Sequence, residues 1–550
     1  MTYLAIAAGT IPMLPGCVGP FSTDDFLAFD PPPERTGQID ALRLEDQSRS
    51  EPVTVAQAVE EETVQRVLER PEPPEKLELT LEEVRVAALA NNLDLQVELV
   101  SPAIAQTSVD EEEAKFESVF SAAVRRSRYD APTTTPLIEG TRTTINSFDF
   151  GVTIPLRTGG TANVRLPFSD NETNNPQAFL NPSYNADLTF SISQPLLRNA
   201  WNRVNTHSIR VARHQRRIAD AAAKLETIRV LANADRAYWR LYAAQRELDV
   251  RQQQYEAAMT QLDSARRRVK AGTRAEIEIT RAEVGVAQRL EAIIITETTV
   301  RSRRRDLKRI MQRNDLPMDS ATVLMLATDP DPVGLELDPE QLAEFAVTNR
   351  MEMLELELRL AIDASTVSLQ RNARLPLITL DYTYNISGLG RNYDRAFDQL
   401  PDHTFEDWTV GLAAEIPLGN EAAEARLHRA VLQRVQRLAT KQQRREAIRQ
   451  EVFNALDQLQ QNWQRILAAF QEVILAQRTY EAEQRQFDVG ARTSTDVLDA
   501  AASLADAQSR EILALTDYQI SQVDIAFATG TLLGYERVRW EPIDTDRSED

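Results

Sequence analysis

The sequence is poor in cysteine, in glycine and in basic charge. Its 550 residues include one cysteine, Cys17, which excludes an internal disulfide bond, and only 18 glycines. Acidic residues number 83 and basic residues 62, so the formal net charge is −21, which argues against a nucleic-acid partner. No apolar run reaches the roughly 18 residues that a transmembrane helix needs. We therefore expect neither a disulfide-stabilised domain, nor a helical membrane protein, nor a nucleic-acid-binding protein.

The sequence also lacks the motifs of common catalytic and metal sites. It contains no Walker loop, nucleophile elbow or Cys/His cluster. His207 and His214 are separated by more than the spacing of the His pairs that bind zinc from one helix. Gly388 and Gly390 follow a predicted strand but lack the third glycine of a phosphate-binding loop. We expect no enzymatic activity, no cofactor and no metal.

The chain is instead rich in the residues and spacings of long paired helices. Ala, Gln, Glu, Leu and Arg are abundant, which is typical of coiled coils. The residues of one apolar seam are spaced alternately four and three positions apart, and then seven positions apart. They are Val452, Leu456, Leu459, Trp463, Ile466, Phe470, Val473, Tyr480 and Phe487. An earlier seam repeats every seven residues, at Leu241, Leu248, Tyr255, Leu262 and Val269. The two seams predict helices over about 198–270 and 421–488, each on the order of 100 Å long.

Each long helix ends at a glycine and is followed by a returning helix. Gly490 ends the second helix, because glycine adopts the left-handed conformation at little steric cost, and Thr493 or Ser494 can cap the helix that follows. Gly272 ends the first helix in the same way. The returning helices are predicted over about 274–312 and 492–529. The chain therefore contains two long helical hairpins, which indicates an internal duplication.

Both copies begin with capped helices and then change to the alternation of strands. Thr80 and Glu83 form a capping box, and Asp338 precedes Pro339 as an N-cap. Apolar and polar residues then alternate, with the apolar positions at Tyr184, Ala186, Leu188, Phe190 and Ile192 in the first copy and at Ile378, Leu380, Tyr382, Tyr384, Ile386, Trp408, Val410, Leu412, Ala414 and Ile416 in the second. A weaker strand is predicted over 119–129. This pattern fits a transmembrane barrel strand or a soluble sandwich strand.

The remaining segments complete the predicted organisation. Residues 1–17 form an apolar signal peptide ending at Cys17, where the preceding residues resemble a lipoprotein processing site, so Cys17 is predicted to carry lipid. An acidic, proline-rich arm follows over 18–78. The first structural repeat is predicted over 79–312, a connection over 313–337 and the second repeat over 338–534. The acidic tail covers 535–550.

A helix pair, a strand pair and a long helical hairpin, all present twice, resemble the TolC-type outer-membrane efflux family. The most specific match is the second tip, Val489-Gly490-Ala491-Arg492-Thr493 with Asp496-Val497-Leu498-Asp499-Ala500. Gln194-Pro195-Leu196-Leu197 and Thr80-Leu81-Glu82-Glu83 match further landmarks, and the Cys17 motif resembles the lipidated branch. The resemblance implies a mainly α protein with a β part. Four main strands per chain would form a twelve-stranded barrel in a homotrimer, above a periplasmic barrel of helices.

The resemblance also implies the roles of particular residues. Arg492 and Glu278 match a pair that links the closed tips, and Asp496 and Asp499 match acidic rings at the aperture. The two tips would dock a periplasmic adaptor that works with an inner-membrane pump; the docking residues are Gly272, Thr273, Arg274, Val489, Gly490 and Ala491. From the residues alone, Arg492 and Asp496 are equally explained as an ion pair within one helix.

Three functions remain open from the sequence. The function it favours is a passive outer-membrane channel for efflux. The alternatives are an elongated periplasmic coiled-coil scaffold without a pore, and an outlet dedicated to type I protein secretion. An additional alternating hairpin over 145–167 in the first copy is expected outside the barrel mouth, or else it widens the sheet.

Overall fold

The computed structural model describes residues 75–134, 140–273 and 275–540. These residues belong to one compact unit, Pro74–Asp550. Cys17, the signal peptide and most of the N-terminal arm lie outside the described residues. Among the described residues, no helix is both long enough and apolar enough to cross a membrane.

The helices confirm the duplication. Those of the first copy are α3 (Leu81–Asn91), α4 (Leu93–Ala114), α6 (His207–Lys270) and α7 (Ile277–Met311). Those of the second copy are α8 (Pro339–Asn349), α9 (Met351–Ala373), α11 (Glu421–Asp488) and α12 (Ser494–Ala528). The lengths match in order: 11, 22, 64 and 35 residues against 11, 23, 68 and 35. Three short helices are α5 (Asn202–Asn205), α10 (Tyr393–Phe397) and α13 (Leu532–Tyr535).

The predicted caps form at both copies. The Glu83 carboxylate accepts a hydrogen bond from the Thr80 backbone N–H at 2.8 Å, and the Thr80 hydroxyl accepts one from the Glu83 N–H at 3.2 Å. In the second copy, Oδ1 of Asp338 accepts from the N–H groups of Glu340 and Gln341. These bonds satisfy N–H groups that the first turn of a helix otherwise leaves unpaired.

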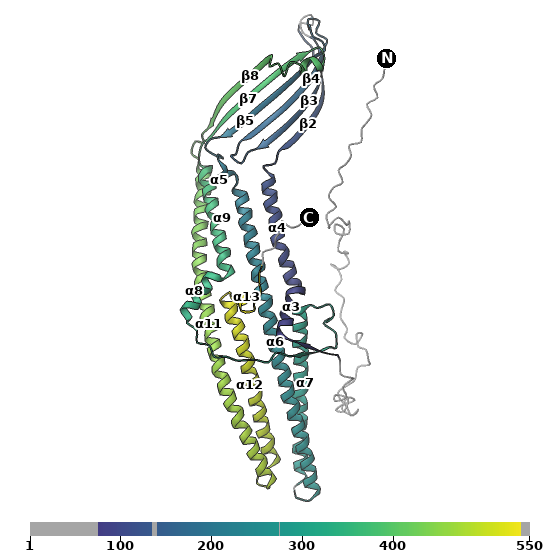
Figure 1. The fold of residues 1–550 in the computed structure, drawn as a ribbon, viewed down its shortest axis with the longest axis vertical. Coiled ribbons are helices and arrows are strands. Elements are labelled where there is room, and N and C mark those ends of the chain that lie inside the picture. The colour runs from purple at the N-terminus through teal and green to yellow at the C-terminus, as the bar shows by residue number, and fades with distance from the viewer. Residues whose placement is uncertain (1–74, 135–139, 274, 541–550) are drawn as a thin grey trace, which may run out of the picture. The chain divides into compact units, whose positions relative to one another are not determined.

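The helices lie side by side in a single layer (Figure 1). In the half near the sheet the contacts run in the order α4, α6, α9, α11. In the half that ends at the tips they run in the order α7, α6, α12, α11. The continuous helices α6 and α11 therefore support the shorter helices of both halves. Helix α11 lies at one side of the layer, and α4 and α7 lie at the other.

One antiparallel sheet of six strands joins the helices at the end remote from the tips (Figure 1). Its order is β2 (Val119–Asp130), β3 (Arg142–Pro155), β4 (Thr161–Thr173), β5 (Ser183–Pro195), β7 (Leu377–Gly390) and β8 (Phe405–Glu415). The mainly α fold with a sheet is confirmed. The additional hairpin provides β3 and β4 inside the sheet, so its expected place outside the barrel mouth is wrong and the wider sheet is confirmed. Each chain thus contributes six strands where the sequence predicted four main ones.

The register gives the sheet one apolar and one polar face. Phe150 lies opposite Leu166, Val164 opposite Phe190, and Tyr382 opposite Val410. Because opposing residues point to the same face, the apolar side chains form a continuous surface across all six strands. Asp149, Thr189, Asp381 and Thr409 lie on the other face with further polar residues.

Two cores pack around the middle of the helix layer. A parallel strand pair that the sequence did not predict, β1 (Lys76–Leu79) with β6 (Val323–Leu326), packs Leu79 and Leu324 against Tyr238 and Leu241 of α6. Around α11, the seam residues Val452, Leu456, Leu459 and Ile466 are buried. Phe470 departs from the predicted seam, being 49% exposed, whereas Ala469 is buried.

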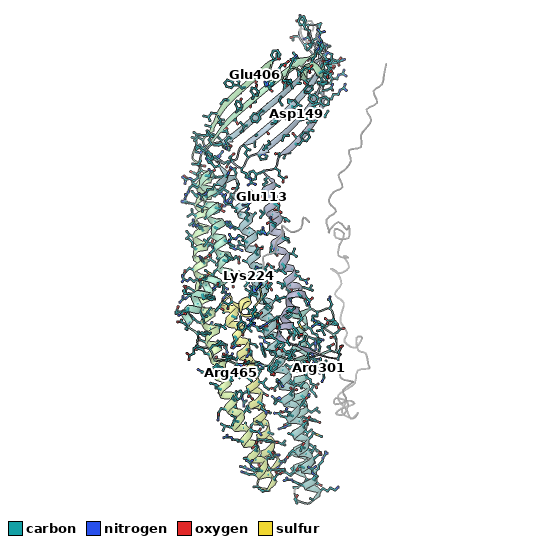
Figure 2. All side chains as sticks on the ribbon, viewed as in Figure 1. Glu113, Asp149, Lys224, Arg301, Glu406 and Arg465 are labelled. Atoms are coloured by element: carbon teal, nitrogen blue, oxygen red, sulfur yellow. The ribbon has the colours of Figure 1, made fainter. Side chains whose placement is uncertain are left out.

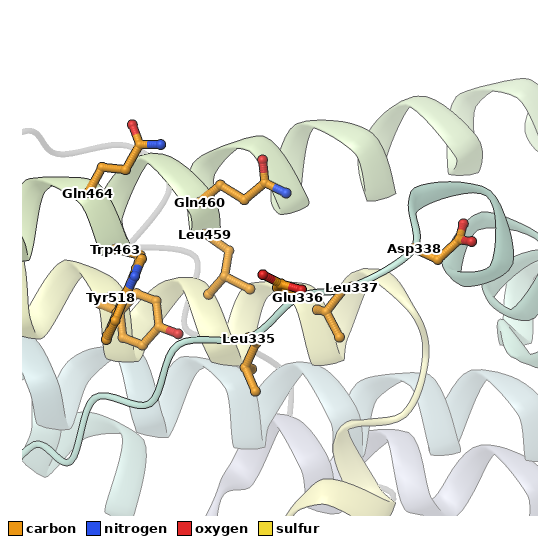
Figure 3. A pocket seen from close by; sticks show the side chains of 9 residues that line it. All are labelled: Leu335, Glu336, Leu337, Asp338, Leu459, Gln460, Trp463, Gln464 and Tyr518. Carbon is orange, nitrogen blue, oxygen red and sulfur yellow. The ribbon is translucent and has the colours of Figure 1, made fainter.

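The connection between the copies crosses α11 and α12 as a strap. Trp463 of α11 and Tyr518 of α12 line a cavity of about 420 Å³ beneath it, together with Leu335, Glu336, Leu337, Asp338, Leu459, Gln460 and Gln464 (Figure 3). The Tyr518 hydroxyl donates a hydrogen bond to the Val333 carbonyl. At Gly334 an added Cβ would lie 3.0 Å from the Trp463 ring, so a larger residue would fit only if this ring shifted.

Candidate gate at the helix tips

The two tips have the local structure that their glycines predicted. Gly272 has φ of +73° and Gly490 has φ of +84°, in the region that favours glycine. A Cβ added at either glycine would meet nothing within 4 Å, and Val489 is 81% exposed. Thr273 and Ala491 are also exposed, whereas Arg274 lies outside the described residues. The tips therefore present an open surface at the end of the hairpins.

Thr493 and Asp496 start α12 as a capping box. The Asp496 carboxylate accepts a hydrogen bond from the Thr493 backbone N–H at 2.8 Å, and the Thr493 hydroxyl accepts one from the Asp496 N–H. The bonds from the Thr493 backbone and hydroxyl hold the pKa of Asp496 below its usual range. The Asp496 carboxylate therefore already stabilises the start of α12, whichever further role it has.

Asp499 lies one turn further along α12 and is exposed. Its carboxylate forms no hydrogen bond or ion pair with any residue that the structure describes. Its charge acts on the Arg289 guanidinium, whose pKa is nevertheless lowered by burial. Of the two predicted aperture acids, Asp499 is therefore the one whose charge is available to ions in solution.

Glu278 joins the two hairpins through Ser494. Glu278 is 8% exposed, and its carboxylate accepts a hydrogen bond from the Ser494 hydroxyl and pairs with Arg281 at 2.8 Å. Burial opposes ionisation, but the hydrogen bonds from Ser494 and the charge of Arg281 outweigh it and lower the pKa of Glu278. A carboxylate stabilised in this way holds the start of α7 against the start of α12.

Arg492 makes its contacts at the end of α11. Its Nε lies 3.2 Å from the Glu483 carboxylate and donates to the Gln486 side chain at 3.1 Å. The structure thus places both Arg492 and Glu278 at the tips, with these partners. The predicted link between the two remains a prediction.

Arg268, which the sequence did not single out, makes the most extensive contact between the tips. It donates to the Phe487 carbonyl at 3.1 Å and to the Asp488 carboxylate at 3.0 Å. Its guanidinium lies 4.3 Å from the centroid of the buried Phe487 ring. Higher up, Arg289 donates to the Leu498 carbonyl at 3.1 Å. The ends of α6 and α7 are thereby fastened to the ends of α11 and α12.

Among residues 75–134, 140–273 and 275–540, no three potential metal-ligating side chains cluster. The tip carboxylates instead cap a helix, join hairpins or face solvent. Such a site can hold two hairpins together and can interact with ions, which are mechanical and electrostatic roles.

Comparison with known proteins gives one consistent family. The model of the family described as "Outer membrane efflux protein" matches residues 342–531. "Outer membrane protein TolC" of Vibrio cholerae serotype O1 is 24% identical over 340 residues, covering 61% of this chain and 74% of that protein. "Outer membrane protein TolC" of Escherichia coli (strain K12) is 24% identical over 325 residues, covering 57% of this chain and 64% of that protein.

Solved structures show the same fold at lower identity. The outer-membrane channel OprN aligns with a TM-score of 0.60 at 16% identity, over 82% of this chain and 90% of that one. The Campylobacter jejuni CmeC outer membrane channel aligns with a TM-score of 0.59 at 14% identity, over 85% of this chain and 90% of that one.

Proposed function

Because the chain is a TolC-type outer-membrane efflux protein, we propose that three copies form a passive conduit from the periplasm to the cell exterior. The family consists of channels, not enzymes, and its members lie in the outer membrane and extend into the periplasm. In this proposal a periplasmic adaptor docks at the helix tips, and an inner-membrane pump supplies the cargo and the energy.

The two-faced sheet is the observation that carries the proposal. Its apolar face runs across all six strands and includes exposed aromatic and aliphatic side chains such as Phe120, Trp408 and Leu412. Its other face is polar from β2 to β8. Lipid on one side and a water-filled pore on the other account for both faces, whereas a soluble sheet would have its apolar face covered by protein.

The helix layer supports an assembly of several copies. Four helices lie side by side in each half, and the outermost helices at both edges of the layer expose apolar residues. On α11 these include Leu432, Val435 and Phe470, and on α4 they include Val97 and Ile104. Exposed apolar surface of this kind marks a contact with another protein chain. In the proposed trimer, α11 of one copy covers α4 and α7 of the next.

The tips act as the gate in this proposal. The contacts of Arg268 with Phe487 and Asp488, and of Glu278 with Ser494, hold the two hairpins of one chain together. An adaptor that binds the exposed residues around Gly272 and Gly490 has direct access to these contacts. Separation of the hairpins then widens the periplasmic end.

Reconstitution tests the conduit directly. The full chain, purified from outer membranes in detergent, is added to planar lipid bilayers and single-channel currents are recorded. We expect discrete conductance steps and a preference for cations, because three Asp499 carboxylates surround the aperture. A protein that is monomeric and soluble without detergent, or that leaves the bilayer silent, would contradict the proposed function.

A further inference from the structure

The sheet has two unpaired edges of nearly equal length. β2 spans 12 residues and β8 spans 11 residues; among the residues that the structure describes, β2 pairs only with β3 and β8 only with β7. Almost every residue of both strands is exposed. Within a lipid bilayer the unpaired N–H and C=O groups of an edge strand are costly, so both edges require a partner strand.

The directions of the strands allow the two edges to pair with each other. All six strands are antiparallel to their neighbours, so β2 and β8 run in opposite directions. β2 follows α4 and β8 precedes α11, and these helices lie at opposite sides of the helix layer. A neighbouring copy that covers α4 with its α11 therefore brings its own β8 beside β2.

The charges on the two edges are complementary. Arg125, Arg126 and Arg128 are exposed in the half of β2 remote from the helices, and within the described residues none of them forms an ion pair. Glu406 and Asp407 are exposed at the corresponding end of β8, where Figure 2 labels Glu406. Glu406 accepts a hydrogen bond from the Tyr384 hydroxyl at 2.6 Å through one carboxylate oxygen, which leaves the other oxygen for an arginine.

We propose that β2 of one copy pairs with β8 of the next copy, with Arg126 opposite Glu406. This register also sets Arg125 opposite Asp407 on the polar face, because successive residues of a strand point to opposite faces. On the apolar face it sets Val124 opposite Trp408, Ala122 opposite Val410 and Phe120 opposite Leu412. The Arg126–Glu406 pair lies on the same face as these apolar pairs, at the outer end of the strands. One register thus pairs opposite charges on both faces and continues the apolar surface from Val124 to Phe120 across the contact between the two copies.

The proposal changes the expected size of the outer pore. It rests on the proposed three-copy conduit, in which three six-stranded sheets close into a barrel of eighteen strands instead of the twelve that the resemblance implies. Barrel diameter grows roughly linearly with strand number, so the barrel is about half as wide again, and barrels of about 16–18 strands leave an aqueous channel. The helix layer still contributes four helices per copy at each level, so the narrow point stays at the tips and the outer end is wider than the helical part.

Pairs of introduced cysteines test the contact between β2 of one copy and β8 of the next in the intact protein. In the proposed register Ala123 of one copy faces Thr409 of the next on the polar face, so the first test pair is Ala123→Cys with Thr409→Cys. On the apolar face Ala122 faces Val410, so the second test pair is Ala122→Cys with Val410→Cys. Adjacent pairs alternate between the two spacings of an antiparallel ladder, so one of these pairs has the closer Cβ atoms that a disulfide needs. The matched control, Ala123→Cys with Ala413→Cys, is shifted by four residues. Each variant with a single introduced cysteine controls for disulfides that form with the native Cys17.

After mild oxidation of outer membranes, we expect at least one of the two facing pairs to give covalent dimers and trimers on a non-reducing gel. The shifted pair and the single variants should give at least fivefold less. As a second arm, Arg126→Glu or Glu406→Arg should each reduce the gel-resistant trimer severalfold, and the two together should restore it. Trimers without cross-links from either facing pair would overturn the eighteen-stranded closure while leaving the conduit intact. A protein that forms no trimer at all would overturn the conduit itself.

Discussion

At the scale of single residues, the contact between the two tips depends on which side chains of one hairpin reach the other. Arg268 is the last of three consecutive arginines, and nothing in the sequence distinguishes it from Arg267. Helix geometry turns Arg268 toward Phe487 of α11, whereas Arg267 is exposed. The sequence could identify the tip and its glycines, but the contact between two hairpins requires the packing of the whole layer.

Removal of the Arg268 side chain is expected to loosen the closed tip. Its cation–π contact and its exposed ion pair are together worth about 1 kcal/mol per chain. We predict that Arg268→Ala raises the closed-state conductance in planar bilayers, whereas Arg267→Ala, which removes the same charge one residue earlier, does not. Equal conductance of the two variants would show that Arg268 does not hold the tip.

Asp499 and Asp496 are expected to respond differently to neutralisation. Asp499→Asn should reduce the cation preference of the open channel and leave the melting temperature unchanged, because its carboxylate has no partner among the described residues. Asp496→Asn should lower the melting temperature, because Asp496 caps α12. Ion preference from reversal potentials and thermal melting separate the two effects. An unchanged reversal potential in Asp499→Asn would remove that residue from the aperture.

A buried carboxyl near the C-terminus is expected to make stability depend on pH. The Glu536 side chain is buried 3.5 Å from the Arg85 guanidinium, which also binds Asp235 through two hydrogen bonds. Burial, followed by the negative charge of Asp235, raises the pKa of Glu536 to about 8, although the charge of Arg85 opposes this. A raised pKa contributes stability that is fully present below about pH 4.3 and is lost as the pH rises toward about 8.

Glu536→Gln is expected to remove this loss. The free energy of unfolding of the unmodified protein should fall relative to the variant by up to about 1.4 kcal/mol per pH unit between about pH 5 and about pH 8, and then level off. Denaturation of both proteins in detergent over this range measures the difference. A difference that stays constant across the range would show that Glu536 does not titrate there.

At the scale of helices and strands, the local sequence pattern was sufficient to locate an element wherever one hydrophobic period continued over many residues. Helix α11 has the predicted bounds, and β2, the weakest predicted strand, spans Val119–Asp130. The place of β3 and β4 could not be predicted, because alternation fixes the face of a strand but not its neighbours. β1 and β6 have four residues each and pair over a long sequence separation, so no local signal marked them.

The aromatic cluster on β4 is expected to fix the outer end of the sheet. Phe168 lies 5.0 Å from Phe148 and 5.4 Å from Phe397, measured between ring centroids, and also contacts Phe150 and Tyr393. Each such pair contributes about 0.5–1.5 kcal/mol beyond its buried area. We predict that Phe168→Ala lowers the unfolding free energy by about 2–3 kcal/mol.

The matched control for this cluster is Phe179→Ala. Phe179 lies in the turn after β4 and is fully exposed, so its removal should leave the unfolding free energy unchanged. Thermal melting of both variants in detergent measures the effect. Equal melting temperatures would show that the cluster does not stabilise the sheet.

At the scale of the whole molecule, one chain is a single layer with two open sides. The helices follow one another across the layer, and the strands do the same across the sheet. Both ends of this order, α4 with β2 and α11 with β8, leave apolar side chains or backbone groups uncovered. We explain this exposure by the proposed neighbouring copies, which cover the sides and enclose a hollow axis.

Electron cryomicroscopy of the detergent-solubilised particle would show whether the copies assemble in this way. We predict three copies around a hollow axis, with twelve helices in cross-section below and eighteen strands in a closed ring above. Single chains with both sides exposed, or hairpins packed solidly without a central channel, would contradict it.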